Sequence, residues 1–181
     1  MKRYLIPAAL LAAAFLAGCG GPASQKAVSI QSVPAASASV PAEQEALLTV
    51  YLPNEKGLRV VPHVLQVKAK EKTLKNALFQ MIQMDRKAQY PILPTGLTVK
   101  NVTVKDGTAV INFSKELKNL SGGTTTETLF AAMIVNTATE FPNVRQVSFE
   151  MEGKPLRTLT GHMDFSNPLK RDESMISAEK K

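Results

Sequence analysis

The strongest constraint on the fold is a helix-forming stretch that leads directly into a strand, between Gly122 and Val147. Thr124 and Glu127 form a capping-box pattern, in which the hydroxyl and the carboxylate each satisfy a backbone N–H of the first helical turn. This pattern predicts a helix that starts at Thr124. Pro142 disfavours helical geometry for the residue before it, so we expect the helix to end near Glu140.

The side chains of this predicted helix recur at three- and four-residue steps along one face. Those on the face are Phe130, Met133, Ile134, Thr137 and Phe141. Leu129 and Val135 lie off it, so we expect burial on more than one side of the helix. Val147, Phe149 and Met151 then alternate with polar residues, which predicts a strand.

The N-terminus has the pattern of a secretory signal peptide over residues 1–18. Lys2 and Arg3 precede an apolar run over residues 4–17 that is too short for a membrane span, which needs about 20 apolar residues. The run ends in Leu16-Ala17-Gly18-Cys19, which resembles the lipobox of bacterial lipoproteins. The resemblance implies cleavage before Cys19 and a lipid on its sulfur; the alternative is a generic signal peptide with a chance cysteine. By resemblance to envelope-sorting rules, Gly20 permits delivery to an outer membrane.

Cys19 is the only cysteine in the chain, so an internal disulfide and a cysteine-based metal or redox site are excluded. A lipidated Cys19 would hold the exported chain on a membrane, because two or more acyl chains anchor stably. Residues 19–45 are rich in Ala, Ser, Pro and Val without periodicity, which predicts a disordered tether. Residues 166–181 are polar, and we expect a second disordered tail there.

Residues 46–165 form one predicted domain, with no internal repeat. The expected elements are strands at 47–52 and 58–67, a helix at 72–86, strands at 99–104 and 108–113, the helix described above, and strands at 144–151 and 155–159. Pro62 favours an edge position for its strand, and Asp106-Gly107 predicts a tight hairpin. This order favours an α+β fold, with a mixed, largely antiparallel sheet and two main helices on one face.

The titratable residues show no catalytic or metal-binding pattern. His63 and His162 lack the neighbouring ligands that a metal site needs, so a structural or surface role is expected for both. Glu127 and Glu140 lie 13 residues apart, about 19.5 Å along one helix, too far to flank one bond. No motif for nucleophilic hydrolysis or phosphate binding is present, and we expect no enzyme activity, cofactor or metal.

Two polar features of the sequence have a plain structural interpretation. Asn136 and Thr137, inside an apolar helix, are expected to bond to neighbouring backbone rather than to a ligand. Four lysines at a predicted strand-to-helix junction favour a solvated face. They are Lys68, Lys70, Lys72 and Lys75. The formal net charge of the chain is +7, but export and the absence of interleaved aromatic residues argue against nucleic acid. Attraction to an anionic envelope polymer or to lipid headgroups is the alternative role for these lysines.

Several short segments together resemble the GerM-like domain, also called the sporulation and spore germination domain. They are 50–54 (VYLPN), 93–97 (LPTGL), 104–107 (VKDG), 109–114 (AVINFS), Gly122-Gly123, Glu127, Asn136-Thr137, 140–142 (EFP), Val144, Val147, Gly153 and Gly161-His162. Their order covers nearly all of residues 46–165. The resemblance implies a fold similar to ring-building domains and a role in envelope assembly rather than catalysis.

Three functions remain open at this point. The first is a membrane-tethered module that assembles with itself or with an envelope protein, in sporulation or elsewhere. The second is a lipoprotein that binds peptidoglycan or an anionic surface polymer. The third is an accessory to an envelope hydrolase.

Overall fold

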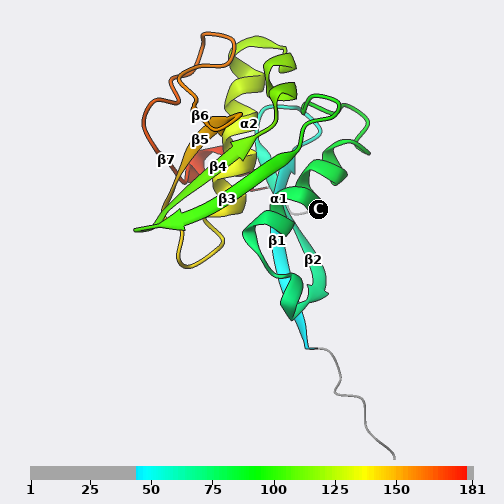
Figure 1. Ribbon diagram of the computed structural model, residues 1–181. Helices are drawn as coiled ribbons and strands as arrows, with labels where there is room; N and C mark the ends of the chain where they lie inside the picture. Colours follow the sequence, from blue (N-terminus) through cyan, green and yellow to red (C-terminus); the bar gives the residue numbers. More distant parts are fainter. Residues whose placement is uncertain (1–43, 179–181) are drawn as a thin grey trace, which may run out of the picture. The chain divides into compact units, whose positions relative to one another are not determined.

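A computed structural model describes residues 44–178 of the chain (Figure 1). In order, its elements are β1 (Glu45–Pro53), β2 (Val60–Lys68), η1 (Ala69–Glu71), α1 (Leu74–Asp85), β3 (Val99–Lys105), β4 (Thr108–Phe113), η2 (Lys115–Asn119), α2 (Gly123–Ala138), β5 (Gln146–Met151), β6 (Lys154–Pro155), β7 (Leu169–Lys170) and η3 (Glu173–Met175). The predicted α+β class is confirmed. The predicted signal peptide, Cys19 and the tether up to residue 43 lie outside the described residues.

The β1–β2 hairpin forms a sheet of its own, with antiparallel pairing along its whole length. Its turn is held by Asn54 Oδ1, which accepts hydrogen bonds from the Leu58 and Arg59 backbone N–H groups at 3.1 and 3.3 Å. Pro62 lies opposite Tyr51 and lacks an N–H. The Tyr51 N–H instead donates to Thr137 Oγ1 of α2 at 3.0 Å, which ties the hairpin to the helix.

The second sheet is mixed, with strand order β3-β4-β5, and both β6 and β7 pair with β5. β3 and β4 form the predicted hairpin, in which Asp106 and Gly107 both take positive φ, 52° and 81°. β4 and β5 are parallel, so the chain must cross over between them, and it does so through α2. The predicted last strand at 155–159 is limited to the two residues of β6.

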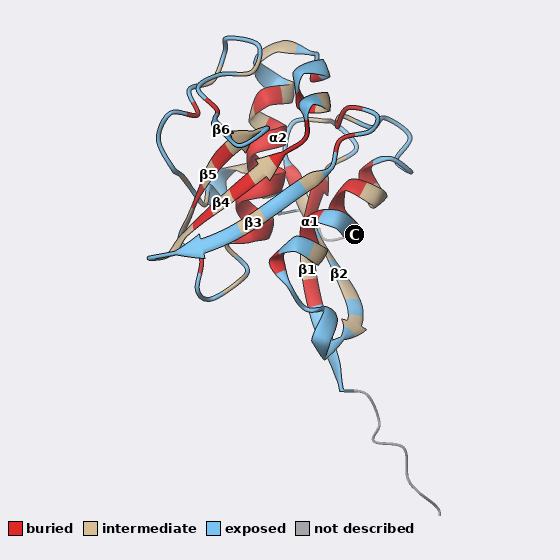
Figure 2. Ribbon diagram, in the orientation of Figure 1, coloured by how far each residue is buried: buried red, intermediate tan, exposed pale blue. Residues whose placement is uncertain are grey.

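Helix α2 is buried on nearly every side (Figure 2). This agrees with the prediction from Leu129 and Val135, the apolar residues that lie off its main face. Every residue at positions 129–138 is buried. The helix packs against β1, α1 and β5. At its centre the Phe130 ring lies 5.6 Å from Phe113, 5.8 Å from Phe149 and 6.2 Å from Phe165, measured between ring centroids. The apolar core of the domain is therefore built around this helix.

Helix α1 starts and packs as its sequence predicts. Thr73 caps it, with its side-chain oxygen accepting from the Asn76 N–H. The predicted apolar stripe is buried: Leu74, Ala77, Leu78, Met81 and Ile82. The buried Asp85 carboxylate accepts the backbone N–H groups of Ile92 at 3.3 Å and Leu93 at 2.9 Å. It thereby fixes the loop that follows the helix.

The predicted capping box at Thr124 and Glu127 is wrong. α2 begins at Gly123, its N-cap Gly122 has φ 118°, and no side chain caps it. Glycine enters this left-handed region at little cost, so the chain can begin the helix there without a capping side chain. Glu127 is fully buried and accepts hydrogen bonds from the backbone N–H and the hydroxyl of Thr160. The Glu127 carboxylate is therefore bonded to a residue 33 positions away and not to the first turn of the helix.

The predicted disordered tail is wrong for residues 166–178. Leu169 and Lys170 form β7 against β5, and Ile176 makes a parallel bridge to Val60. The Ser177 N–H donates to the Val60 carbonyl at 2.7 Å. The composition of this segment is polar, but its few apolar residues and Arg171 find partners on elements distant in sequence, which outweighs the entropy of ordering it.

Candidate functional site

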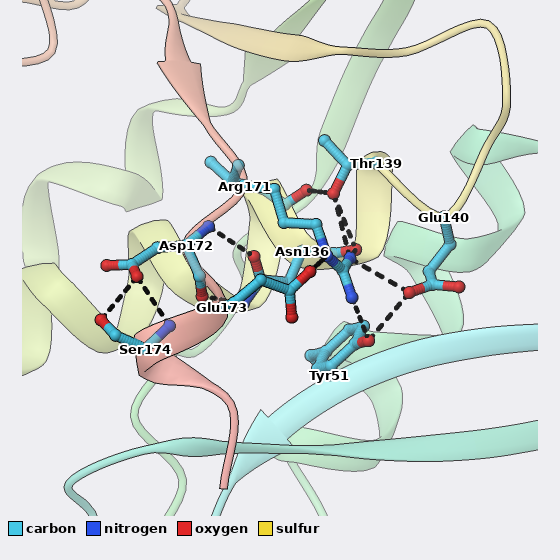
Figure 3. Close-up of polar contacts among 9 residues, drawn as sticks. Tyr51, Asn136, Thr139, Glu140, Arg171, Asp172, Glu173 and Ser174 are labelled. Carbon is cyan, nitrogen blue, oxygen red and sulfur yellow. Dashed lines mark hydrogen bonds and ion pairs between the residues drawn. The ribbon is translucent and has the colours of Figure 1, made fainter.

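A network of polar contacts joins three segments: β1, the C-terminal end of α2, and the segment after β7 (Figure 3). We call it the Arg171 cluster. Its members are Tyr51, Asn136, Thr139, Glu140, Arg171, Asp172, Glu173 and Ser174. Together with β7 and the contacts of residues 176 and 177 to Val60, it attaches the C-terminal segment to the rest of the fold.

Arg171 occupies the C-terminal end of α2. Its Nη1 donates to the Asn136 carbonyl at 3.0 Å and to Thr139 Oγ1 at 3.2 Å. The last carbonyls of a helix lack intrahelical donors and carry partial negative charge, so a guanidinium there is favourable. Arg171 therefore supplies in three dimensions the basic group that the last turn of α2 lacks in its own sequence.

The other contacts of the guanidinium reach carboxylates and Tyr51. Nη1 lies 3.1 Å from Glu140 Oε1, and Nε lies 2.5 Å from Glu173 Oε1. Nη2 donates to the Tyr51 hydroxyl at 2.7 Å, and that hydroxyl donates to Glu140 Oε1 at 2.8 Å. Tyr51, Glu140 and Arg171 thus close a ring of three contacts, in which each polar group has a partner.

The electrostatics of the cluster keep Tyr51 and Arg171 in their ordinary charge states. Burial raises the pKa of the Tyr51 hydroxyl, the hydrogen bond from Arg171 opposes this, and Glu140 raises it further. Burial lowers the pKa of Arg171, but Glu173, Tyr51 and Glu140 together raise it above its usual value. Tyr51 is therefore a neutral donor and Arg171 a permanent cation, which suits a structural clamp rather than proton transfer.

Asn136 extends the cluster along the C-terminal segment. Its Oδ1 accepts from the Asp172 N–H at 3.3 Å, and its Nδ2 donates to the Asp172 carbonyl at 3.4 Å. The Asp172 carboxylate then caps η3 by accepting from the Ser174 N–H at 2.9 Å. Asn136 and Thr137 do bond to backbone, as expected, but the backbone belongs to segments remote in sequence.

The two glutamates considered as an acid/base pair lie at opposite ends of α2. Glu127 lies in the second turn of α2 and is bonded to Thr160. Glu140 follows the last turn of α2 and belongs to the Arg171 cluster. Burial raises the pKa of the Glu127 carboxyl, but the N–H and hydroxyl of Thr160 outweigh it, so the net pKa lies below its ordinary value. Glu127 is an ionised anchor for the loop that contains Thr160.

The histidines do not assemble into a site either. His63 lies in β2 opposite Val50, and His162 lies in the loop after β6, beside Gly123. Among residues 44–178, no group of three or more His, Cys, Asp or Glu side chains is placed to hold a metal ion. No helix in this part of the chain has the length and apolar character needed to cross a membrane.

Two surface hollows accompany the C-terminal segment. One, of about 430 Å³, lies between the β1–β2 turn and residues 176–178, and its charged lining residues are Lys56 and Arg59. The other, of about 220 Å³, lies between α2 and the C-terminal segment and is largely apolar, with Lys170 and Asp172 at its margin.

Comparison with known proteins decides the family. The family model described as "Sporulation and spore germination", named Germane, matches residues 49–157. The chain belongs to this family. The Germane domain so defined includes Tyr51, Glu127 and Glu140, whereas Arg171 lies beyond the matched residues.

Solved structures support the assignment of the Germane domain. The chain is similar to the tandem GerMN domains of the sporulation protein GerM from Bacillus subtilis, with 27% identity and a TM-score of 0.58. The match covers 70% of this chain and 46% of the tandem chain, so this chain spans about half of that structure. The first GerMN domain of the same protein matches at 26% identity and TM-score 0.56, over 70% of this chain and 98% of that domain. A search of curated proteins gave no match.

Sequence reasoning missed the centre of the cluster. Tyr51 stands inside the 50–54 segment that carries the family resemblance, so its position was visible although its role was not. Arg171 lies in a polar stretch without periodicity, and no local signal distinguishes it from the other basic residues of the chain.

Proposed function

We propose that this chain is an exported lipoprotein, anchored through Cys19, whose Germane domain acts without catalysis in protein–protein assembly at the cell envelope. The observation that carries the proposal is the order of two features: the Leu16-Ala17-Gly18-Cys19 motif after an apolar run, and the family domain from residue 49. The anchor would be on the extracytoplasmic face of the cell membrane or the outer membrane. Residues between the two features would serve as tether.

The polar chemistry of the domain supports a non-catalytic role. The carboxylates that attract attention in the sequence, Glu127 and Glu140, accept hydrogen bonds from Thr160 and Tyr51 and are parts of internal contacts. A general acid or base must instead reach a substrate atom. Assembly needs only a stable surface, and the closed Arg171 cluster provides rigidity for one.

The similar structures connect the domain with sporulation, because both belong to a protein described as the sporulation protein GerM. One of them contains tandem GerMN domains, and the present match spans 46% of it. A single Germane domain would need a second copy of the chain, or a separate envelope protein, to place two such domains side by side. Self-association and an envelope partner are therefore the two forms of the proposal.

The anchor is tested by expressing the full chain in a bacterium, isolating membranes and measuring the intact mass. The expected mass is that of a chain that starts at Cys19 and carries a diacylglycerol, with or without a further acyl group. Cys19→Ala should abolish the lipid and release the protein from the membrane fraction. A processed chain without added lipid would contradict the anchor.

Assembly is tested on the non-lipidated chain 20–181 by light scattering across a wide concentration range, and by crosslinking of the lipidated form on membranes. A rise in molar mass, or one reproducible crosslinked partner, supports assembly. The alternative function, binding of peptidoglycan or an anionic surface polymer, predicts a monomer that is retained on purified cell-wall sacculi. That result would replace the assembly proposal.

A further inference from the structure

The preceding chain joins the domain beside the junction of β2 and α1. The Gln44 carbonyl accepts a hydrogen bond of 2.7 Å from the Ala69 N–H, and Glu45 pairs with Lys68 across the hairpin. Gln44 is the first described residue, so a chain that leads from an upstream anchor enters the domain at this end. The surface around the junction therefore lies beside the residue at which the chain from the proposed lipid enters the domain.

Basic side chains dominate this junction. The exposed lysines are Lys68, Lys70, Lys72 and Lys75. Two carboxylates, Glu45 and Glu71, are also exposed here, which leaves an excess of two positive charges. Lysines that gather next to a membrane attachment point are attracted to anionic headgroups, by an amount that falls off within a Debye length.

An exposed aromatic residue continues the basic surface along α1. Phe79 is 53% exposed, and it lies one helical turn after Lys75 on the side opposite the buried stripe. The only acidic residue of α1, Asp85, is buried and bonded to the loop after the helix. The solvent-facing side of α1 thus carries an apolar ring, one cation, Lys75, and no anion. The other three lysines of the junction precede the helix, and apolar and basic side chains together are typical of surfaces that lie on membranes.

We propose that these five residues, Lys68, Lys70, Lys72, Lys75 and Phe79, form a junction surface that binds the anionic lipid headgroups of the leaflet holding the anchor. The lysines contact the headgroups and Phe79 enters the interface between headgroups and acyl chains. The proposal rests on the proposed membrane anchorage, which brings the surface to the leaflet. It also sets the orientation of the domain, because the side that carries α1 faces the leaflet, next to β3, where the Lys75 ammonium donates to the Lys100 carbonyl at 3.4 Å.

Binding is measured with the non-lipidated chain 20–181, which retains every described contact. The probe is a sucrose-loaded vesicle of phosphatidylcholine alone, or of phosphatidylcholine and phosphatidylglycerol in equal parts. We expect sedimentation with the anionic vesicles only, and loss of binding as NaCl is raised from about 0.05 to about 0.5 M. Equal binding to both vesicles, or none to either, would overturn the proposal.

A matched pair of variants separates the junction surface from general positive charge. Replacing Lys68, Lys70, Lys72 and Lys75 by Gln should weaken apparent affinity for anionic vesicles by about tenfold or more. The control replaces four exposed lysines elsewhere, Lys105, Lys115, Lys118 and Lys154, by Gln, an equal change in net charge. An equal loss in both variants would show attraction without a docking surface and would refute the proposal. Unchanged thermal melts establish that both variants fold.

A fluorescent label reports which side of the domain meets the lipid. Chain 20–181 contains no cysteine, so Phe79→Cys and Lys154→Cys each provide one labelling site. A polarity-sensitive label at position 79 should shift to the blue on anionic vesicles, and a label at position 154 should not. The reverse pattern would refute the assigned orientation.

Two further outcomes separate this inference from the function on which it rests. If the full chain lacks lipid by intact mass while chain 20–181 still binds anionic vesicles, the anchorage fails and the junction surface stands. If the four-lysine variant loses retention on cell-wall sacculi while the wild type ignores the vesicles, the surface binds polymer and the lipid assignment is wrong.

Discussion

Arg171 Nη2 lies 2.7 Å from the Tyr51 hydroxyl oxygen, a hydrogen bond between residues 120 positions apart. Tyr51 is 4% exposed, and its ring lies 5.3 Å from the guanidinium carbon, so the pair shares both a hydrogen bond and a cation–π contact. This contact attaches the C-terminal segment to β1. The stability of that attachment can be measured directly.

Arg171→Ala should lower the free energy of unfolding by about 2 kcal/mol, because a partly buried cation with hydrogen bonds to Tyr51, Glu140 and the end of α2 is lost. Urea denaturation measures the change. Arg157→Ala, at an exposed arginine, is the control and should change the value by less than about 0.5 kcal/mol. Equal effects of the two variants would mean that the cluster contributes nothing specific.

Glu127→Gln tests the buried carboxylate through pH. The folded pKa of Glu127 is lowered, so its contribution to stability is present above the unfolded carboxyl pKa and is lost as pH falls through the folded pKa. At pH 7 the wild type should exceed Glu127→Gln by about 1–2 kcal/mol, and the gap should shrink below about pH 4. All other titrating groups are shared, so the difference isolates Glu127. A gap independent of pH would exclude the ionised anchor.

Asp85→Ala should free the loop after α1. Two backbone N–H groups, of Ile92 and Leu93, lose their acceptor, at a cost of about 2–4 kcal/mol in the free energy of unfolding. Asp85→Asn keeps one acceptor oxygen, so its free energy of unfolding should lie between those of the wild type and Asp85→Ala. Limited proteolysis should then cut within residues 86–96 faster than in Glu55→Ala, an exposed acidic control. Unchanged cleavage would show that the loop is held by other contacts.

Gly107→Ala tests a crowded turn against an open one. Gly107 has φ 81°, and a Cβ there would overlap the Arg145 guanidinium, whereas Gly153 has φ 75° and open space around it. Gly153→Ala should cost about 1 kcal/mol for the backbone alone, measured by denaturation. Gly107→Ala should cost up to about 1 kcal/mol more, because the exposed Arg145 side chain can move aside only by giving up its hydrogen bond to the Asp106 carbonyl. Arg145→Ala added to Gly107→Ala should recover part of the difference. Identical costs at the two glycines would rule out crowding.

Local signals in the sequence predicted the elements that depend on neighbours in the chain. The Asp106-Gly107 hairpin needs only two residues with positive φ, and the α1 stripe needs only a helical period, so both are confirmed. The enclosure of α2 followed from Leu129 and Val135 lying off its main face. In each case the physical cause acts over a few residues, where a single sequence carries the information.

The contacts that define the candidate site depend on the tertiary fold. Glu127 has the spacing of a capping box, but its carboxylate accepts two hydrogen bonds from Thr160, 33 residues away, and none from the first turn of α2. Arg171 stands in a stretch whose composition predicts disorder, and only the meeting of β1 with the end of α2 creates its partners. No pattern within either segment encodes those encounters.

The separation of Tyr51 from Arg171 also sets an order of events on the ribosome. β1, α1 and the whole of α2 are synthesised before Arg171, and the β1–β2 ladder joins residues near in sequence. In a nascent chain that stops short of Arg171, the Tyr51 hydroxyl and the Glu140 carboxylate have only each other as partners. The side of α2 that faces the C-terminal segment is then left uncovered. Incomplete translation products should therefore expose apolar helix surface, and proteases that survey such surface would recognise them until the clamp can close.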